Sequence, residues 1–222
     1  MSVTRWLLAC GIVGAALFLA MDWIASFWLY PGYDITSQQV SELSAIGAPS
    51  RPFWMTLGFL HAALTFAFAY GVWRASAGRR GVKALAALLA LFALNSFLWG
   101  WLAPMHMRGV AFTVTDTLHI AFTVVAVVLM ASFMTIGAWI YDSRFRWFSG
   151  AVLVAMLVCG GIVGTQVPAI AQGLPTPWMG LVERVSVYAP SFWMAVLALV
   201  MIGESAEGRP ARRRAHGESF SH

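Results

Sequence analysis

Charged residues are scarce in this chain: they make up 10% of its 222 residues, whereas 60% of the residues are hydrophobic. An ordinary soluble domain carries about a quarter charged residues, so this chain has too few to cover a water-facing surface. Intrinsic disorder is excluded as well, because its signature is low hydrophobicity, and the mean hydropathy here is +0.75. The composition therefore indicates an integral membrane protein.

Acidic residues are fewer than basic ones, nine against fourteen, and the formal net charge is +5. Such a balance can indicate nucleic-acid binding, but the basic residues gather in a few short loops, where they set the orientation of a membrane protein instead. We therefore expect membrane lipids as partners and no nucleic acid. Cysteine is also rare: Cys10 and Cys159 are predicted to lie at different depths of the membrane, so we expect no disulfide between them.

Six hydrophobic stretches are each long enough to cross a bilayer, which takes about 20 residues per helix. They cover approximately residues 6–30, 52–73, 82–103, 113–140, 147–171 and 178–202. In lipid each backbone must form its hydrogen bonds within its own segment, so the stretches are expected to be helices. The sequence thus predicts an all-α bundle of six transmembrane helices over residues 1–203, followed by an Arg-rich tail, residues 204–222, which we expect to be disordered.

The basic residues also predict the side of the membrane that each loop occupies. Eleven of the fourteen lie on the side that holds the N-terminus, the loops near residues 74–81 and 141–146, and the C-terminal tail. Short loops rich in Lys and Arg stay in the cytoplasm, so we expect both termini to be cytoplasmic. The remaining loops, near residues 31–51, 104–112 and 168–177, are expected to face outward.

Polar residues within the spans show a second asymmetry, because all six spans place them in the outer half and almost none in the inner half. They are Asp22, His61, Asn95, Asp116, His119, Gln166, Glu183 and Arg184. An ionisable residue inside a membrane costs about 2.5–3.5 kcal/mol on insertion scales, and such residues are usually functional or paired. We infer a polar pocket that opens outward and binds a lipid headgroup or a small polar ligand. Its predicted ligand-binding residues are Asp22, Glu42, Asp116, His119, Glu183 and Arg184.

Asp116 and His119 allow several hypotheses, because residues three apart share one face of a helix. They could bond each other and brace the packing of the helices. Together with His61 they could instead bind zinc, and a metal-bound water would then attack a lipid amide or ester bond. In that membrane-embedded hydrolase the candidate catalytic residues are Asp116, His119 and Glu183. A third hypothesis makes His61 and His119 the axial ligands of a b-type haem.

Glu183 and Arg184 are adjacent, and adjacent side chains on a helix point about 100° apart. We therefore expect each to find its partner elsewhere. Asp22, Asp116 or an anionic headgroup are the candidates for Arg184, and a histidine is the candidate for Glu183.

The first outer loop carries apolar residues on one face, at Val40, Leu43 and Ile46, and ends in a glycine and a proline. This pattern predicts a short amphipathic helix over residues 37–46 that lies on the membrane interface. It would serve either as a lid over the pocket, with Glu42 facing inward, or as an interfacial brace.

Three segments resemble a bacterial six-helix membrane family catalogued as domain of unknown function 998. They are residues 30–33 (YPGY), residues 41–49 (SELSAIGAP) and residues 180–184 (GLVER), and the pair Leu118-His119 also matches. The resemblance covers essentially residues 1–202 and implies six helices in a bacterial cytoplasmic membrane, with no activity to transfer. The polar positions of the family match Ser41, Glu42, His119, Glu183 and Arg184, whereas His106 stands where an acidic residue is expected and receives no role.

Overall fold

The computed structural model describes residues 2–207, and these residues form six long helices and no named strand. The helices are α1 (Val3–Ile24, continued by the π-helical turn η1, Ala25–Leu29), α2 (Arg51–Arg74), α3 (Arg80–Leu102), α4 (Val114–Ile140), α5 (Ser143–Ala171) and α6 (Met179–Glu207). Each is long and apolar enough to cross a membrane. The all-α fold and the six predicted spans are therefore confirmed.

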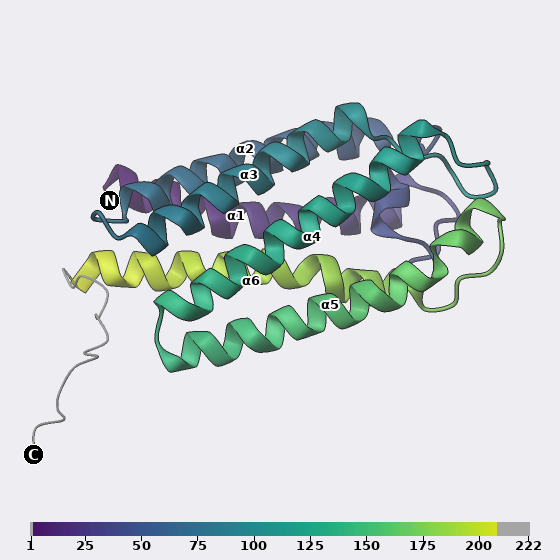
Figure 1. Cartoon of the computed structure of the whole chain (residues 1–222). Coiled ribbons are helices and arrows are strands. Elements are labelled where there is room, and N and C mark those ends of the chain that lie inside the picture. Colours follow the sequence, from purple (N-terminus) through teal and green to yellow (C-terminus); the bar gives the residue numbers. More distant parts are fainter. Residues whose placement is uncertain (1, 208–222) are drawn as a thin grey trace, which may run out of the picture.

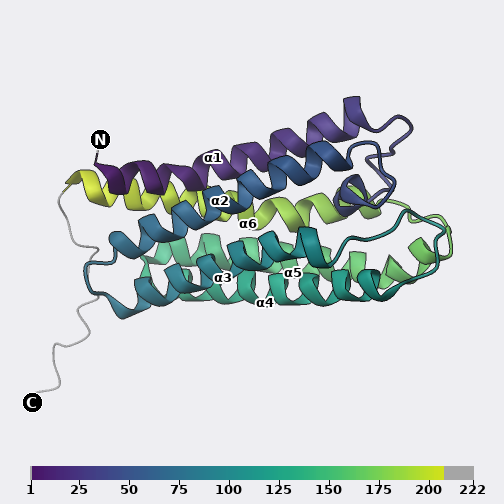
Figure 2. The ribbon, with the colours of Figure 1, turned by 90° about the horizontal axis from the view of Figure 1, so that it is seen from above.

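Each helix packs against its neighbours in sequence, and α1 also packs against α6, so the six close into one bundle (Figures 1 and 2). Because the number of spans is even, α1 begins and α6 ends at the same end of the bundle, which we call the terminal end (Figure 1). The opposite end carries the loops of residues 30–50, 103–113 and 172–178. We call these three loops the polar cap.

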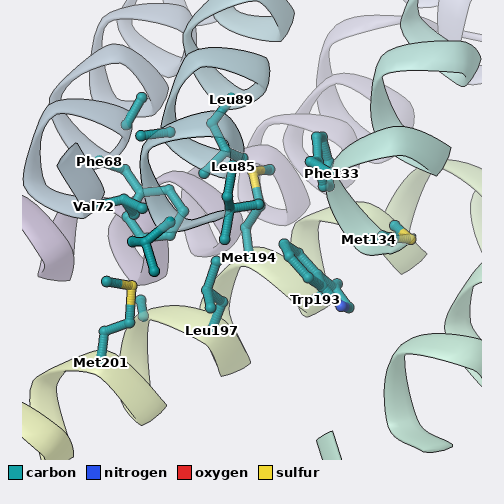
Figure 3. Close-up of a cluster of buried hydrophobic side chains, with 14 of the residues drawn as sticks. Phe68, Val72, Leu85, Leu89, Phe133, Met134, Trp193, Met194, Leu197 and Met201 are labelled. Carbon is teal, nitrogen blue, oxygen red and sulfur yellow. The ribbon is translucent and has the colours of Figure 1, made fainter. Parts of the chain in front are cut away.

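The half of the bundle nearer the termini is filled by an apolar core to which all six helices contribute (Figure 3). Trp193 of α6 is fully buried there, lies 5.2 Å from Phe133 between ring centroids, and donates its indole N–H to Ser149 at 2.8 Å. Gly137 makes room for this indole, since a Cβ at residue 137 would collide with the ring. No Asp, Glu, Lys or Arg residue of the described chain is fully buried in this half.

The first loop of the polar cap contains a single 3-10 turn, η2 (Val40–Ser44), which is shorter than the helix predicted over residues 37–46. Asp34 explains the difference, because it accepts hydrogen bonds from Thr36 and Ser37 and so holds the preceding residues in a turn. Val40 and Leu43 are buried and η2 packs against α2 and α6. The segment therefore lies on the bundle through these apolar side chains.

The predicted tail, residues 204–222, begins within α6, which continues to Glu207. The rest of that tail lies outside the described residues.

Candidate functional site

Arg184, near the start of α6, and Asp22, near the end of α1, form an ion pair with two parallel hydrogen bonds of 2.9 Å. Both side chains are buried, and Asp22 also accepts hydrogen bonds from Ser26 and Tyr188. The remaining N–H groups of the guanidinium reach the Tyr33 and Ser26 hydroxyls and backbone carbonyls at 3.0–3.4 Å. Of the partners predicted for Arg184, the structure places Asp22 against it. Every donor of Arg184 is thus used within the protein.

Arg108 and Glu42 form a second two-pronged ion pair, with two hydrogen bonds of 2.7 Å. Arg108 also donates to the hydroxyl of Thr176 and to the backbone carbonyl of Ser37, each at 2.7 Å. These contacts join all three loops of the polar cap, because Glu42, Arg108 and Thr176 each come from a different loop. Glu42 additionally caps η2 by accepting the backbone N–H of Gln39.

The first loop docks directly on the start of α6. The backbone N–H of Gly180 donates to the carbonyl of Thr36 at 2.9 Å. The carbonyls of Ile35 and Gln38 come so close to the Cα of Gly180 that a Cβ there would collide with both. Only glycine permits this approach of the two backbones.

Glu183 is a carboxylate whose hydrogen bonding this network does not complete. Its Oε2 accepts a hydrogen bond from the backbone N–H of Val40, the first residue of η2, and not from a histidine as predicted. Its Oε1 makes no hydrogen bond to any described residue. Oε1 is not among the polar side-chain atoms that are both fully enclosed and unpartnered. Because it has no partner, it must keep some accessible surface.

Asp116 lies near the start of α4 and contacts His106, for which the sequence predicts no role. The backbone N–H of His106 donates to Oδ1 at 2.7 Å, and Nδ1 of its ring lies 2.9 Å from Oδ2. The N–H and the hydroxyl of Thr113 also bond Oδ2, at 2.9 and 2.8 Å. The hypothesis that Asp116 and His119 bond each other is therefore wrong, because Asp116 turns back to cap its own helix.

His119 packs on α3 instead. Its Nδ1 lies 3.0 Å from the indole nitrogen of Trp99 and 2.9 Å from the carbonyl oxygen of Ala103. One nitrogen cannot serve both groups at once: a protonated Nδ1 donates to the carbonyl, and an unprotonated Nδ1 accepts from the indole. The other ring nitrogen, Nε2, bonds no described residue and is not fully enclosed.

His61 lies between α1 and α2, with its ring 5.4 Å from that of Phe18. Its Nε2 is enclosed and has no hydrogen-bond partner among the described residues. His61, His119 and Asp116 thus contact three different sets of neighbours. No group of three His, Cys, Asp or Glu residues in the described chain could hold a metal ion, so the predicted zinc site is not assembled. No observation brings His61 and His119 together as haem ligands.

The surroundings shift the pKa values of two titratable groups in the first loop, Asp34 and Tyr33. The hydroxyls of Ser37 and Thr36 hold the pKa of Asp34 down to about 2. Burial raises the pKa of Tyr33 well above its ordinary value. The phenol of Tyr33 therefore stays protonated and donates toward the carbonyls of Gln38 and Gln39 at 3.0 and 2.8 Å.

Two hollows on the described surface are apolar and lie away from the polar cap. One, of about 290 Å³, lies between α2 and α3 beside Tyr70 and Trp73, and the other, of about 670 Å³, runs along α5 from Trp147 to Cys159. Neither is lined by a predicted site residue. Within the polar cap, the charged side chains contact one another.

Several residues of this network were missed in the sequence. Tyr188 follows Arg184 by four residues, and this spacing on a helix was a readable signal that both face Asp22. Arg108 and Thr176 carried no such signal, because they meet Glu42 from separate loops.

The fold and the polar cap define a six-helix integral membrane protein whose buried charges are gathered at one end of the bundle. A family model described as Protein of unknown function (DUF998) matches residues 12–200, and the chain therefore belongs to this family. The match confirms the resemblance found in the sequence. A search of curated proteins and a search of solved structures found no match.

Proposed function

We propose that this protein binds the headgroup of a membrane lipid, or another small polar ligand, beside the polar cap on the outer side of the membrane. The observation that carries the proposal is Glu183, with one hydrogen bond from Val40 and one free, accessible oxygen. A carboxylate in a membrane span is costly unless donor groups meet its oxygens. A donor group of a ligand at Oε1 would complete the hydrogen bonding of Glu183.

The distribution of buried charge supports this location. The buried Asp, Glu and Arg side chains of the described chain all lie in the polar cap or in the helix ends next to it: Asp22, Glu42, Asp116 and Arg184. Near the terminal end the fully buried polar side chains carry hydroxyls, such as those of Ser76 and Ser149, and the partly exposed Arg146 has one enclosed guanidinium nitrogen. Apolar side chains suffice to pack helices there, so the charges at the other end favour a binding role.

The residues of the proposed site have different roles. Glu183 contacts the ligand. Asp22 and Arg184 hold the start of α6 against α1, and Glu42 fixes η2, which presents the Val40 N–H. Asp116 and His119 lie on α4, and Nε2 of His119 bonds no described residue.

Native mass spectrometry of the purified full chain tests the proposal. We expect the wild-type protein to keep a bound lipid or small polar molecule when detergent is removed, and Glu183→Ala to lose it. Glu204→Ala, on the same helix near the terminal end, is the matched control and should keep it. The proposal is overturned if the wild type keeps no ligand and no membrane lipid shifts its unfolding temperature.

A further inference from the structure

We infer that the group bound at Glu183 is a primary ammonium, either the headgroup amine of an ethanolamine lipid or a free amine. This inference rests on the proposed function and adds the chemical class of the ligand. It follows from the charges around Glu183 and from the hydrogen bonding that its oxygen allows.

Glu183, when ionised, carries a negative charge that no basic side chain of the described residues balances. Of the neighbouring carboxylates, Asp22 is paired with Arg184 and Glu42 is paired with Arg108. No basic side chain of the described residues forms an ion pair with Glu183. A cation would balance this charge, whereas an anionic headgroup would add to it.

The free oxygen of Glu183 also selects among cations. A carboxylate only accepts hydrogen bonds, so a cation with N–H donors binds it better than a quaternary ammonium does. Quaternary ammonium groups are recognised by aromatic cages, and the Tyr33 ring already lies under Arg184, 5.7 Å from its guanidinium carbon. A calcium ion requires six to eight oxygen ligands, and the described residues offer no cluster of three acidic or metal-ligating side chains.

The apolar side chains beside Glu183 separate it from the enclosed His61. One turn after Glu183, Val187 packs on an apolar cluster formed by residues of α1, α2, η2 and α6, which also include Phe18 and Trp54. The Phe18 ring contacts His61, whose Nε2 lacks a partner and whose side chain is nine-tenths buried. His61 thus contacts the apolar cluster through Phe18, and its enclosed Nε2 takes no part in the amine site. The ion pairs of Arg108 and Asp116, by contrast, leave no carboxylate unpaired.

The test measures binding of defined lipids to the full chain in phosphatidylcholine nanodiscs. Phosphatidylethanolamine, its N-methylated forms and phosphatidylglycerol are added in turn, and soluble ethanolamine forms a separate arm. We expect phosphatidylethanolamine to bind about tenfold more tightly than phosphatidylcholine or phosphatidylglycerol, and affinity to fall with each added methyl group. Glu183→Gln keeps an acceptor for the Val40 N–H but removes the charge, and it should abolish this preference. Glu204→Gln should not.

The outcomes separate this inference from the proposed function. If soluble ethanolamine competes at similar affinity, the source is a free amine, and if it does not, the source is the lipid headgroup; both support a primary ammonium. Equal binding of all the lipids, or an unchanged preference in Glu183→Gln, overturns the inference and leaves the proposed function standing. The absence of any binding overturns the proposed function itself. Should Glu183→Gln not fold, the methylation series in the wild type still decides.

Discussion

Arg184 and Asp22 are 162 residues apart in sequence, yet their side chains form a buried ion pair with two hydrogen bonds of 2.9 Å. The pair joins the first turns of α6 to the last turns of α1, where the six-helix bundle closes. Tyr33 and Ser26 bond the same guanidinium. The first loop of the polar cap is thereby tied to the closure of the bundle.

Replacing one partner of this ion pair should lower stability more than replacing both partners with apolar residues. Removing one partner of a buried ion pair leaves an uncompensated charge and costs about 3–5 kcal/mol, whereas apolar replacement of both is often close to neutral. We expect Arg184→Met and Asp22→Leu each to lower stability by such an amount, and the double variant to lose less than either. Unfolding in detergent, analysed as a double-mutant cycle, measures this. Simple addition of the two losses would contradict it.

The pair of Arg108 and Glu42 should control the order of the polar cap more than the stability of the bundle. Arg108 is partly exposed, with 21% of its side-chain surface accessible, and hydrogen bonds to charged groups contribute about 1.5–3 kcal/mol. We expect Arg108→Ala to make the cap loops sensitive to proteases and to lower the unfolding free energy by no more than this. Arg51→Ala is the control, because among the described residues the Arg51 side chain donates only to the backbone carbonyl of Ser44. Equal protease sensitivity of the two variants would refute the prediction.

The spans could be predicted from the sequence because runs of about 20 apolar residues have one stable form in lipid. The partner of Arg184 was one of three candidates, since the angle between adjacent helical residues excluded Glu183. The bond between Asp116 and His119, one of several hypotheses for this pair, does not form, because Thr113 and Asp116 make a helix-capping pattern that occupies the carboxylate. The ion pair of Glu42 and Arg108 forms because two separate loops meet in space. No local sequence pattern predicts such a meeting.

His61 offers a test of whether an unsatisfied buried group serves a ligand. Its Nε2 has no partner among the described residues, and an unpaired buried polar group costs about 1–3 kcal/mol. We therefore expect His61→Leu to raise the unfolding temperature of ligand-free protein. Thermal unfolding after extensive delipidation measures this. Asn95→Leu is the control and should lower the unfolding temperature, because Asn95 donates a hydrogen bond to the carbonyl of Phe122. A loss of stability in His61→Leu would show that Nε2 is satisfied.

Asp34 should make the first loop sensitive to acid. Its folded pKa is about 2 because hydroxyls of Ser37 and Thr36 stabilise the carboxylate, whereas an unfolded aspartate titrates near about 3.9. A lowered pKa contributes stability that is complete above pH about 4 and is lost as the pH falls through about 2. We expect the difference in unfolding temperature between wild type and Asp34→Asn to be constant from neutral pH to about 4 and to shrink below it. A constant difference down to pH 2 would contradict this prediction.

The orientation of the bundle decides which leaflet the polar cap meets, and cysteine labelling measures it. Val110 in the cap and Ala77 near the terminal end are both exposed, so a cysteine at either is reachable once Cys10 and Cys159 are replaced by serine. The excess of Lys and Arg near the terminal end predicts that this end is cytoplasmic. We expect a membrane-impermeant maleimide to label intact cells through Val110→Cys and not through Ala77→Cys, with both labelled after permeabilisation. The reverse pattern would place Glu183 in the cytoplasmic half of the membrane, and the amine would then have to come from that side.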